Sequence, residues 1–296
     1  MNILITGASG LIGTALQRTL AKEGHTVYSL QRDKKTLNDF YWQPTQGMIH
    51  FNPSIAIDAV INLAGANISN GRWTQKKKQL ILDSRVKSTQ CLSEYISKLQ
   101  TPPKIYISGS AIGFYGETGS RTVTESSQTG ADFLSDVARQ WEAATQPAVD
   151  AGIRTINLRT GIVLSANGGA LQKMLFPFKL GLGGVVGSGN QYMSWVSIND
   201  VTRVISFILK TERIKGPLNM VTPEAATNFE FTKLLGRALN RPTIFPMPVF
   251  IARLLFGEMA DALLLTSIRV KPEKLMKLGF SFVDTDLYKT LKSLLK

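Results

Sequence analysis

The chain has 296 residues, of which 44% are apolar and 19% charged, a composition typical of one large globular domain or two modest ones. Its net charge is +13, but the basic residues are spread out, so an anionic ligand is expected rather than a nucleic acid. The single cysteine, Cys91, excludes an internal disulfide and is interpreted as a small apolar filler in a helical stretch.

The first half of the chain alternates short apolar runs with longer amphipathic patterns. Strands are predicted over residues 2–5, 26–30, 59–63, 104–108 and 155–158, and helices over residues 11–22, 79–99 and 132–151. Strands joined by helical crossovers are parallel, and continuous apolar strands suit a sheet covered on both faces. We therefore predict an α/β fold with a doubly wound parallel sheet, a Rossmann domain over residues 1–165.

The second half has a different texture. Residues 167–190 are rich in glycine and predict long loops around a short helix at 171–180, and further helices are predicted over 229–239, 249–265, 269–278 and 285–295. The segment 249–265 carries Arg253, Glu258 and Asp261, too many charges for a membrane span. We predict that residues 166–296 form a smaller substrate-side and C-terminal helical lobe, interleaved with the first domain. The strand-like start predicts no signal peptide, and a cytoplasmic location is the default expectation.

Three glycines lie between the first predicted strand and the first predicted helix, with the spacing G-x-x-G-x-x-G. Gly7 permits a tight turn, Gly10 lets the backbone approach a pyrophosphate, and Gly13 lets the helix pack closely on the strand. The free N–H groups at the helix start then hold phosphates. The turn therefore predicts a nicotinamide dinucleotide, with a merely tight turn as the alternative. The expected contacts are Gly7, Ser9, Gly10, Leu11, Ile12 and Gly13.

The end of the second predicted strand selects between two cofactors. An acid about 20 residues after the glycines would bind the ribose 2′-hydroxyl of NAD, whereas an arginine suits the 2′-phosphate of NADP. Arg32 lies at this point and Asp33 follows it. We predict NADP, as NADPH, with NAD as the alternative if Asp33 is the ribose ligand. Arg32 as a solvated surface charge is the remaining interpretation.

Further motifs follow in a recognisable order: Asn62-Leu63-Ala64-Gly65, Ser108-Gly109-Ser110 with Phe114-Tyr115-Gly116, Leu158-Arg159-Thr160-Gly161, and Trp195 through Val201. In this order they resemble the extended short-chain dehydrogenase/reductases, the group of sugar-nucleotide epimerases and dehydratases. The chain is more closely similar to an epimerase-related subfamily that carries Arg72-Trp73, Ser84-Arg85, Trp141-Glu142 and Gly257-Glu258-Met259. That subfamily ends in a small domain of unknown function, here roughly residues 246–294.

The resemblance implies roles for residues beyond the glycine turn. Leu63, Ala64 and Gly65 should line the adenine and ribose side of the cofactor, and Arg159 and Thr160 should approach the nicotinamide end. Asp200 should tie the second lobe to the first, with a helix N-cap as its alternative. The substrate pocket is expected to include Phe133, Met193 and Trp195.

One departure from the wider family concerns catalysis. That family uses a Tyr-x-x-x-Lys pair on one helix face, in which the lysine lowers the pKa of the tyrosine. Here Phe133 and Val137 stand in those places, and neither transfers a proton. The literal match from Tyr288 to Lys292 lies in the last predicted helix and is interpreted as coincidence.

Other side chains must then supply the proton. Tyr115 is the candidate acid/base, with Ser108 and Ser110 as hydrogen-bonding partners of the substrate. The sequence shows no cation beside Tyr115, so a contact or packing role is its alternative. His25 and His50 lie away from the motifs, and no metal site is expected.

Two functions remain open. The first is an NADP(H)-dependent epimerase or reductase-like oxidoreductase that acts on a small carbonyl or nucleotide-sugar-like substrate by hydride transfer. The second is a non-catalytic NADP(H)-binding redox sensor or scaffold, suggested by Phe133 and Val137. A monomer or a homodimer is expected, with neither a membrane nor a nucleic acid as partner.

Overall fold

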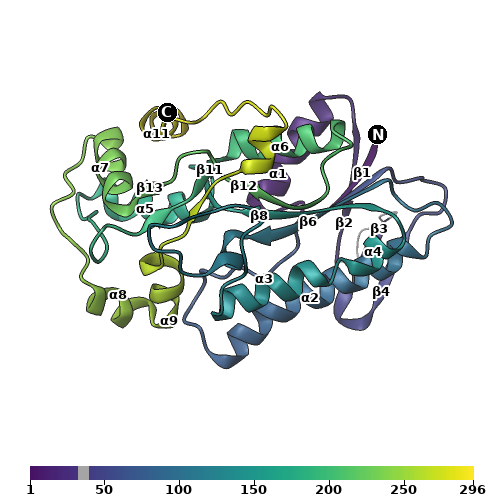
Figure 1. The fold of residues 1–296 in the computed structure, drawn as a ribbon, viewed down its shortest axis with the longest axis horizontal. Coiled ribbons are helices and arrows are strands. Elements are labelled where there is room, and N and C mark those ends of the chain that lie inside the picture. Colours follow the sequence, from purple (N-terminus) through teal and green to yellow (C-terminus); the bar gives the residue numbers. More distant parts are fainter. Residues whose placement is uncertain (33–39) are drawn as a thin grey trace.

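The computed structural model describes residues 1–32 and 40–296, and its centre is a six-stranded parallel sheet (Figure 1). The strands lie in the order β12-β8-β6-β5-β1-β2, and every neighbouring pair is parallel. They are β1 (Asn2–Thr6), β2 (Thr26–Leu30), β5 (Ala59–Asn62), β6 (Ile105–Ala111), β8 (Arg154–Thr160) and β12 (Gly216–Met220). The predicted doubly wound α/β class is confirmed.

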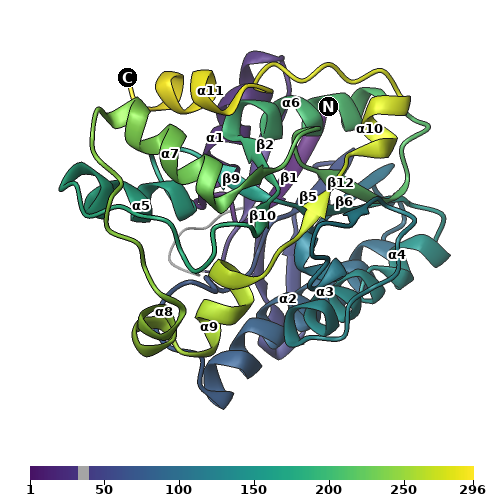
Figure 2. The ribbon, with the colours of Figure 1, turned by 60° about the vertical axis from the view of Figure 1, so that its left-hand side comes forward.

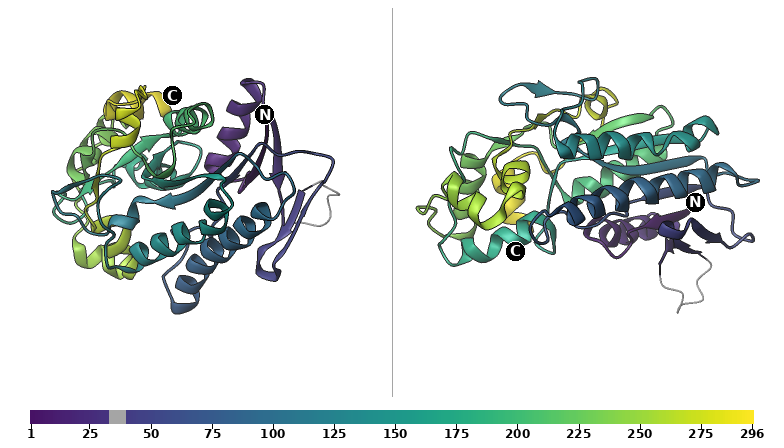
Figure 3. Two further views of the ribbon diagram at one scale, coloured as in Figure 1. Left: turned by 45° about the vertical axis from the view of Figure 1, so that its right-hand side comes forward. Right: turned by 90° about the horizontal axis from the view of Figure 1, so that it is seen from below.

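Helices cover both faces of this sheet. On one face lie α1 (Leu11–Lys22) and α6 (Ile198–Lys210); on the other lie α2 (Gln75–Ser97), α3 (Phe133–Ala143) and α4 (Gln146–Asp150) (Figure 1). Alternate residues of one strand serve the two cores, since Ile5 packs with Leu20 of α1 while Leu4 packs with Leu92 of α2. Burial on both faces explains why the strands are continuously apolar. The helices α2 and α3 run side by side (Figure 3).

Proline or glycine interrupts three of the predicted helices. The expected helix 132–151 is divided into α3 and α4. Pro147 donates no backbone N–H and is tolerated only in the first turn of a helix, so a new helix, α4, begins there. Gly257, with φ of +61°, separates α8 (Val249–Phe256) from α9 (Glu258–Ala260), which continues into a π-turn, η3 (Asp261–Leu265). Pro272 separates β14 (Arg269–Val270) from α10 (Glu273–Lys277), so the expected helix 269–278 is also wrong.

A hairpin that the sequence pattern did not predict follows β2. It consists of β3 (Phe40–Gln43), the 3-10 turn η1 (Pro44–Gln46) and β4 (Met48–Phe51). The backbone N–H of Trp42 donates to the carbonyl of Gln31, 2.9 Å away, which attaches the hairpin beyond the end of β2. Phe40 and Phe51 bury their rings in the core between the sheet and α2.

The second lobe has its own core around α5 (Gly169–Lys179), α7 (Asn228–Leu239) and α11 (Leu287–Leu294) (Figure 2). Its short strand pairs are β9 (Ile162–Leu164) with β11 (Trp195–Ser197), β10 (Tyr192–Met193) with β13 (Ala226–Thr227), and β7 (Thr122–Val123) with β14. Because α6 and β12 belong to the sheet layer yet lie in the chain between α5 and α7, the second lobe is threaded through the first. Among the helices of residues 1–32 and 40–296, none combines the length and apolarity needed to cross a bilayer.

Candidate functional site

The glycine turn after β1 packs directly on the turn after β5. Gly7 has φ of +67°, and a Cβ there would lie 2.8 Å from the carbonyl oxygen of Leu63. A Cβ at Gly13 would lie 2.3 Å from the carbonyl oxygen of Gly7. Strand order reverses between β1 and β5, and ligands of doubly wound sheets bind in the crevice at such a point. The structure thus places both predicted cofactor turns at one crevice.

The start of α1 is open to an anion. Gly10 is the N-cap and provides no side-chain hydrogen bond, and the first turn contains no acidic residue. The first N–H groups of a helix have no intrahelical partner and carry its positive dipole end. Ser9 and Gly10 are exposed, while Leu11 and Ile12 are partly exposed. A cradle of backbone donors with no side chain in the way fits the pyrophosphate of a dinucleotide.

A buried polar network holds the two turns together. The Thr6 hydroxyl donates to Asn62 Oδ1 at 2.6 Å and accepts from the backbone N–H groups of Leu63 and Ala64, each at 3.1 Å. The Asn62 amide in turn donates to Thr89 Oγ1 of α2 at 2.9 Å. Sequence reasoning named Leu63 and Ala64 but missed Thr6, whose hydroxyl fixes their backbone.

Arg32 lies one residue beyond the β-bridge at Gln31, past the carboxyl end of β2, and is exposed. Since β2 is the direct neighbour of β1, this position borders the glycine turn on the side where an adenosine ribose is expected. Asp33, the alternative ribose ligand, lies outside the described residues.

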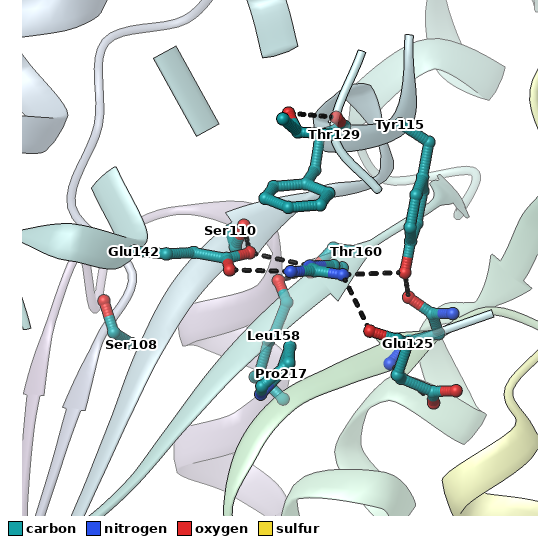
Figure 4. Close-up of polar contacts among 12 residues, drawn as sticks. Ser108, Ser110, Tyr115, Glu125, Thr129, Glu142, Leu158, Thr160 and Pro217 are labelled. Atoms are coloured by element: carbon teal, nitrogen blue, oxygen red, sulfur yellow. Dashed lines mark hydrogen bonds and ion pairs between the residues drawn. The ribbon is translucent and has the colours of Figure 1, made fainter. Parts of the chain in front are cut away.

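A second polar feature joins the carboxyl ends of β6, β8 and β12 (Figure 4). The Ser110 hydroxyl donates to Glu142 Oε1 at 2.7 Å, and Arg159 donates to both oxygens of that carboxylate at 2.8 and 2.9 Å. Arg159 Nη1 also donates to Tyr115 Oη at 3.0 Å, and Tyr115 donates to Asn219 Oδ1 at 2.6 Å. We call Ser110, Glu142, Arg159, Tyr115 and Asn219 the polar chain.

Charges in the polar chain are neutralised internally. Arg159 is 4% exposed; burial alone lowers its pKa, but the ion pair with Glu142 outweighs burial and raises the pKa above its ordinary value. Burial raises the pKa of Tyr115 to about 12, although Arg159 opposes this. The expectation that no cation lies near Tyr115 is therefore wrong. At 2% exposure, Tyr115 is a neutral donor fixed on Asn219.

The other residues predicted at the ends of β6 and β8 also make hydrogen bonds within the chain. Ser108 is fully buried, and its hydroxyl donates to the carbonyl of Gly109 at 3.3 Å. Thr160 is partly exposed, and its hydroxyl donates to the carbonyl of Leu158 at 3.1 Å. Arg159 and Ser110 belong to the polar chain, and both donate to Glu142.

The three residues predicted to line one substrate pocket lie in different surroundings. Phe133 borders a cavity of about 220 Å³ between the first domain and the C-terminal segment, lined also by Trp73, Asp132, Glu258 and Asp261. Trp195 is 1% exposed and borders a separate cavity of about 460 Å³ against α7 and α11. Met193 pairs with Ala226 in the short strand pair β10–β13. The cavities at Phe133 and at Trp195 are separate, because β11 directs Trp195 into the core of the second lobe.

Phe133 and Val137, where a Tyr/Lys pair is absent, form part of an apolar wall with Trp73 and Met259. The Phe133 and Trp73 ring centroids lie 5.6 Å apart, edge to face. Lys78 Nζ lies 4.6 Å from the Phe133 centroid and 2.7 Å from Glu258 Oε1. The contact between Lys78 and Glu258, which are 180 positions apart in the chain, places the C-terminal segment beside the apolar wall. No local sequence pattern predicts it.

Asp200 fastens the C-terminal segment to α6. Its carboxylate is fully buried and accepts from the backbone N–H groups of Val283 at 3.1 Å and Asp284 at 2.9 Å. The N-cap of α6 is Ser197, which accepts from the Asp200 N–H at 3.0 Å, so the N-cap interpretation of Asp200 is wrong. In the part of the chain that the structure describes, no group of three or more His, Cys, Asp or Glu side chains could hold a metal.

Two family models match the chain. Residues 3–220 match the NAD dependent epimerase/dehydratase family, and residues 247–294 match a domain of unknown function, DUF1731. An epimerase family protein of Mycobacterium bovis is 40% identical over 281 residues, covering 95% of this chain and 93% of that protein. The human epimerase family protein SDR39U1 is 34% identical over 302 residues, 99% of each chain.

Solved structures show the same likeness. The structure of the human protein SDR39U1, determined with NADPH, superposes with a TM-score of 0.90 at 33% identity and covers 99% of both chains. A nucleoside-diphosphate sugar epimerase from Corynebacterium glutamicum superposes with a TM-score of 0.80 at 32% identity, over 99% of this chain and 58% of that one.

Proposed function

The chain belongs to the NAD dependent epimerase/dehydratase family, and on this premise we propose that it binds NADPH and transfers hydride to or from a small substrate. A carbonyl compound or a nucleotide-sugar-like molecule is the proposed substrate class. The observation that carries the proposal is the uncapped start of α1, packed through Gly7 on Leu63 at the reversal of strand order. NADPH in the structure of the human relative supports the choice of cofactor.

The residues present fit this cofactor. The N–H groups at the start of α1 would hold the pyrophosphate, Leu63 to Gly65 would border the ribose, and Arg32 would pair with the 2′-phosphate. When bound, the nicotinamide supplies a hydride to a carbonyl carbon or takes one from a carbinol.

Ser110 is the proposed hydrogen-bonding partner of the substrate oxygen. Its hydroxyl is oriented by Glu142, and Arg159 donates to both oxygens of that carboxylate. Tyr115, predicted as the acid/base, is proposed instead as a positioning residue, because its phenol both donates to Asn219 and accepts from Arg159, whereas among the described residues the hydroxyl of Ser110 has the one bond to Glu142. Phe133 and Val137 present an apolar wall that excludes water without moving a proton.

Two measurements test the proposal. Fluorescence titration should show that NADPH binds more tightly than NADH, and Arg32→Ala should remove that preference. NADPH oxidation across a panel of carbonyl compounds and nucleotide sugars should reveal a substrate whose turnover requires Ser110. Tighter binding of NADH, or unchanged NADPH binding in Arg32→Ala, would overturn the NADP assignment. No oxidation of NADPH across the panel would contradict hydride transfer.

A non-catalytic redox sensor or scaffold is the second candidate. It is favoured by Phe133 and Val137 and by the Lys78–Glu258 ion pair, which joins the C-terminal segment to the same wall. Hydrogen exchange compared between NADP⁺ and NADPH distinguishes this function. Protection of α8 and α9 that differs between the two redox states supports sensing, and identical protection contradicts it.

A further inference from the structure

The cavity beside Phe133 lies at the carboxyl edge of the sheet. It is bordered by Gly113, in the 3-10 turn η2 (Ile112–Tyr115) that follows β6, and by Phe133 at the start of α3. The Ser135 hydroxyl donates to the carbonyl of Gly113 at 2.9 Å and fastens α3 to that turn. Ligands of doubly wound sheets bind outside this edge, and Ser110 precedes Gly113 by three residues. The cavity is therefore placed to hold the body of the substrate.

The volume of the cavity limits the size of that substrate. It measures about 220 Å³. An apolar cavity of about 150 Å³ is large enough for benzene, and pockets for drug-sized molecules begin at about 300 Å³. A nucleotide sugar consists of a base, two sugars and two phosphates, and it needs a pocket at least as large as those for drug-sized molecules. A molecule with one ring fits this cavity, whereas a nucleotide sugar does not.

Apolar side chains form the interior of the cavity. Trp73 and Ile268 are each 9% exposed, while Phe133 and Leu134 are partly exposed. The N–H of the Trp73 indole already donates to the carbonyl of Ile68 at 2.8 Å. An indole has no other polar group, so this wall offers a ligand only aromatic and aliphatic carbon. The interior suits an apolar ring or chain better than sugar hydroxyls, because buried hydroxyls need polar partners.

The charged side chains that line the cavity are all acidic. They are the exposed carboxylates of Asp132, Glu258 and Asp261, and of the described lining residues none is a lysine, arginine or histidine. Two cations adjoin these acids, and both are paired. Lys78 Nζ lies 2.7 Å from Glu258 Oε1, and Arg253 donates to Asp261 Oδ1 from Nε at 3.0 Å and Nη2 at 2.9 Å. A diphosphate would therefore lose water and meet like charges without gaining a cation.

We propose that the substrate is a small neutral carbonyl compound, or the corresponding alcohol, whose apolar ring or chain packs on Trp73 and Phe133, and not a nucleotide sugar. This inference rests on the proposed function and selects one of its two substrate classes. In the reducing direction, hydride from NADPH adds to the carbonyl carbon and the oxygen takes a proton from water. The carbonyl becomes an alcohol, and NADPH is oxidised to NADP⁺. Phe133, in the place of the absent tyrosine, is then a specificity-determining residue.

Ligand-observed NMR on the protein saturated with NADP⁺ tests the inference without turnover, because NADP⁺ cannot reduce a carbonyl. The probes are acetophenone, 4-acetylbenzoate, which adds one carboxylate to the same ring, and UDP-glucose. Acetophenone should bind saturably, and 4-acetylbenzoate should bind at least about tenfold more weakly, because it brings a fourth carboxylate to the cavity. UDP-glucose should show no saturable binding.

Two variants locate the probe in the cavity. Phe133→Ala should weaken acetophenone binding about tenfold, because one aromatic contact is lost. Phe176→Ala is the matched control, since Phe176 is 72% exposed and lies outside both cavities, and it should change binding less than about twofold.

Glu258→Gln leaves Lys78 without its acid beside the Phe133 ring. This variant should bind 4-acetylbenzoate about three- to tenfold more tightly and acetophenone with less than about a twofold change. A merely structural role of Glu258 would weaken the binding of both probes together.

The outcomes separate this inference from the proposed function. If the natural chain binds NADPH, but UDP-glucose binds more tightly than acetophenone or acetophenone does not bind saturably, the substrate class is overturned and the proposed function stands. If Phe133→Ala unfolds at the temperature of the natural chain and binds acetophenone equally, the cavity does not hold the substrate. If the natural chain binds no NADPH, the proposed function fails and this inference fails with it.

Discussion

The two arginines at the carboxyl edge of the sheet differ in how their charges are met. Arg159 is buried and donates to both oxygens of Glu142, and its pKa is raised above the ordinary value, because the ion pair outweighs the effect of burial. Arg85 is half-buried between Gly65 and Trp141, and burial lowers its pKa. A charge satisfied within the chain fixes geometry, whereas a charge left unsatisfied is available to a ligand.

The same difference separates the two regions that contain them. The crevice between β1 and β5 presents uncapped N–H groups, as a site for an anion should. The polar chain from Ser110 to Asn219 pairs its own donors and acceptors. We therefore assign cofactor binding to the crevice and the positioning of Ser110 to the polar chain.

The largest expected effect comes from breaking the polar chain at its ion pair. Glu142→Leu leaves Arg159 buried without an acid, and the free energy of unfolding should fall by about 3–5 kcal/mol in urea denaturation. Asp136→Ala is the control on the same helix, because its pair with Arg139 is exposed and its loss should cost less than about 1 kcal/mol. Equal losses in the two variants would show that the polar chain is not an internally balanced unit.

Gly7→Ala tests the crevice. The new Cβ would meet the Leu63 carbonyl at 2.8 Å in a backbone with φ of +67°, so unfolding should become easier by about 1–3 kcal/mol. NADPH binding should be lost, as judged by fluorescence titration. Gly24→Ala is the control, since Gly24 has φ of +81° and open space around it. If both variants bind NADPH alike, the contact between the two turns does not shape the site.

Ser110→Ala sharpens the division between binding and chemistry. It removes one hydrogen bond to Glu142, so stability should fall by about 1 kcal/mol while NADPH affinity stays unchanged. The rate of hydride transfer should fall about 100-fold once a substrate is known. Tyr115→Phe removes the hydrogen bond to Asn219. It should lower the free energy of unfolding by more than it raises the activation free energy of hydride transfer. The reverse order would restore Tyr115 as the acid/base.

Glu125, beside the polar chain, gives the smallest expected effect and a pH signature. It is nearly buried, its Oε1 accepts from the N–H of Asn219, and its Oε2 is a buried atom with no hydrogen-bond partner in the described chain. Burial raises its pKa above the ordinary 4.5, although backbone hydrogen bonds oppose this. The folded state therefore holds the proton more tightly than the unfolded state. The stability this contributes is present below pH 4.5 and is lost as pH rises through the raised value.

Glu125→Gln should remove this dependence. Relative to the natural chain, the variant should gain stability, within about 1 kcal/mol, between pH 4 and pH 7 in urea unfolding. The same pH profile in both proteins would mean that Glu125 keeps its ordinary pKa in the folded state.

The sheet could be predicted from the sequence because its strands are apolar on both faces and its helices cover them. The range expected for the second strand agrees with β2 as found, and the first glycine turn was located from local spacing alone. The hairpin Phe40–Phe51 was missed, because its burial depends on contacts with α2 that no local period encodes. Pro147 carried a local signal for the break between α3 and α4 that the longer helical pattern masked.

The polar chain was beyond sequence reasoning for a different reason. Ser110 and Tyr115 were singled out, but Glu142 and Asn219 come from distant elements and meet Arg159 only in the folded sheet. The hydrogen bonds of Glu142 and Asn219 decide which polar side chains of this region remain free to bind a ligand. Arg85 likewise stood in a recognised motif, but only the fold shows that no acidic side chain of the described residues lies within ion-pair distance of it.

The central claim, that the crevice binds the cofactor and the polar chain does not, is tested most directly by titrating NADPH into Gly7→Ala and Ser110→Ala under conditions in which both are folded. We expect the dissociation constant of Ser110→Ala to match that of the natural chain within about twofold, and Gly7→Ala to show no saturable binding. Saturable binding to Gly7→Ala at the natural affinity, with loss of binding in Ser110→Ala, would contradict the account.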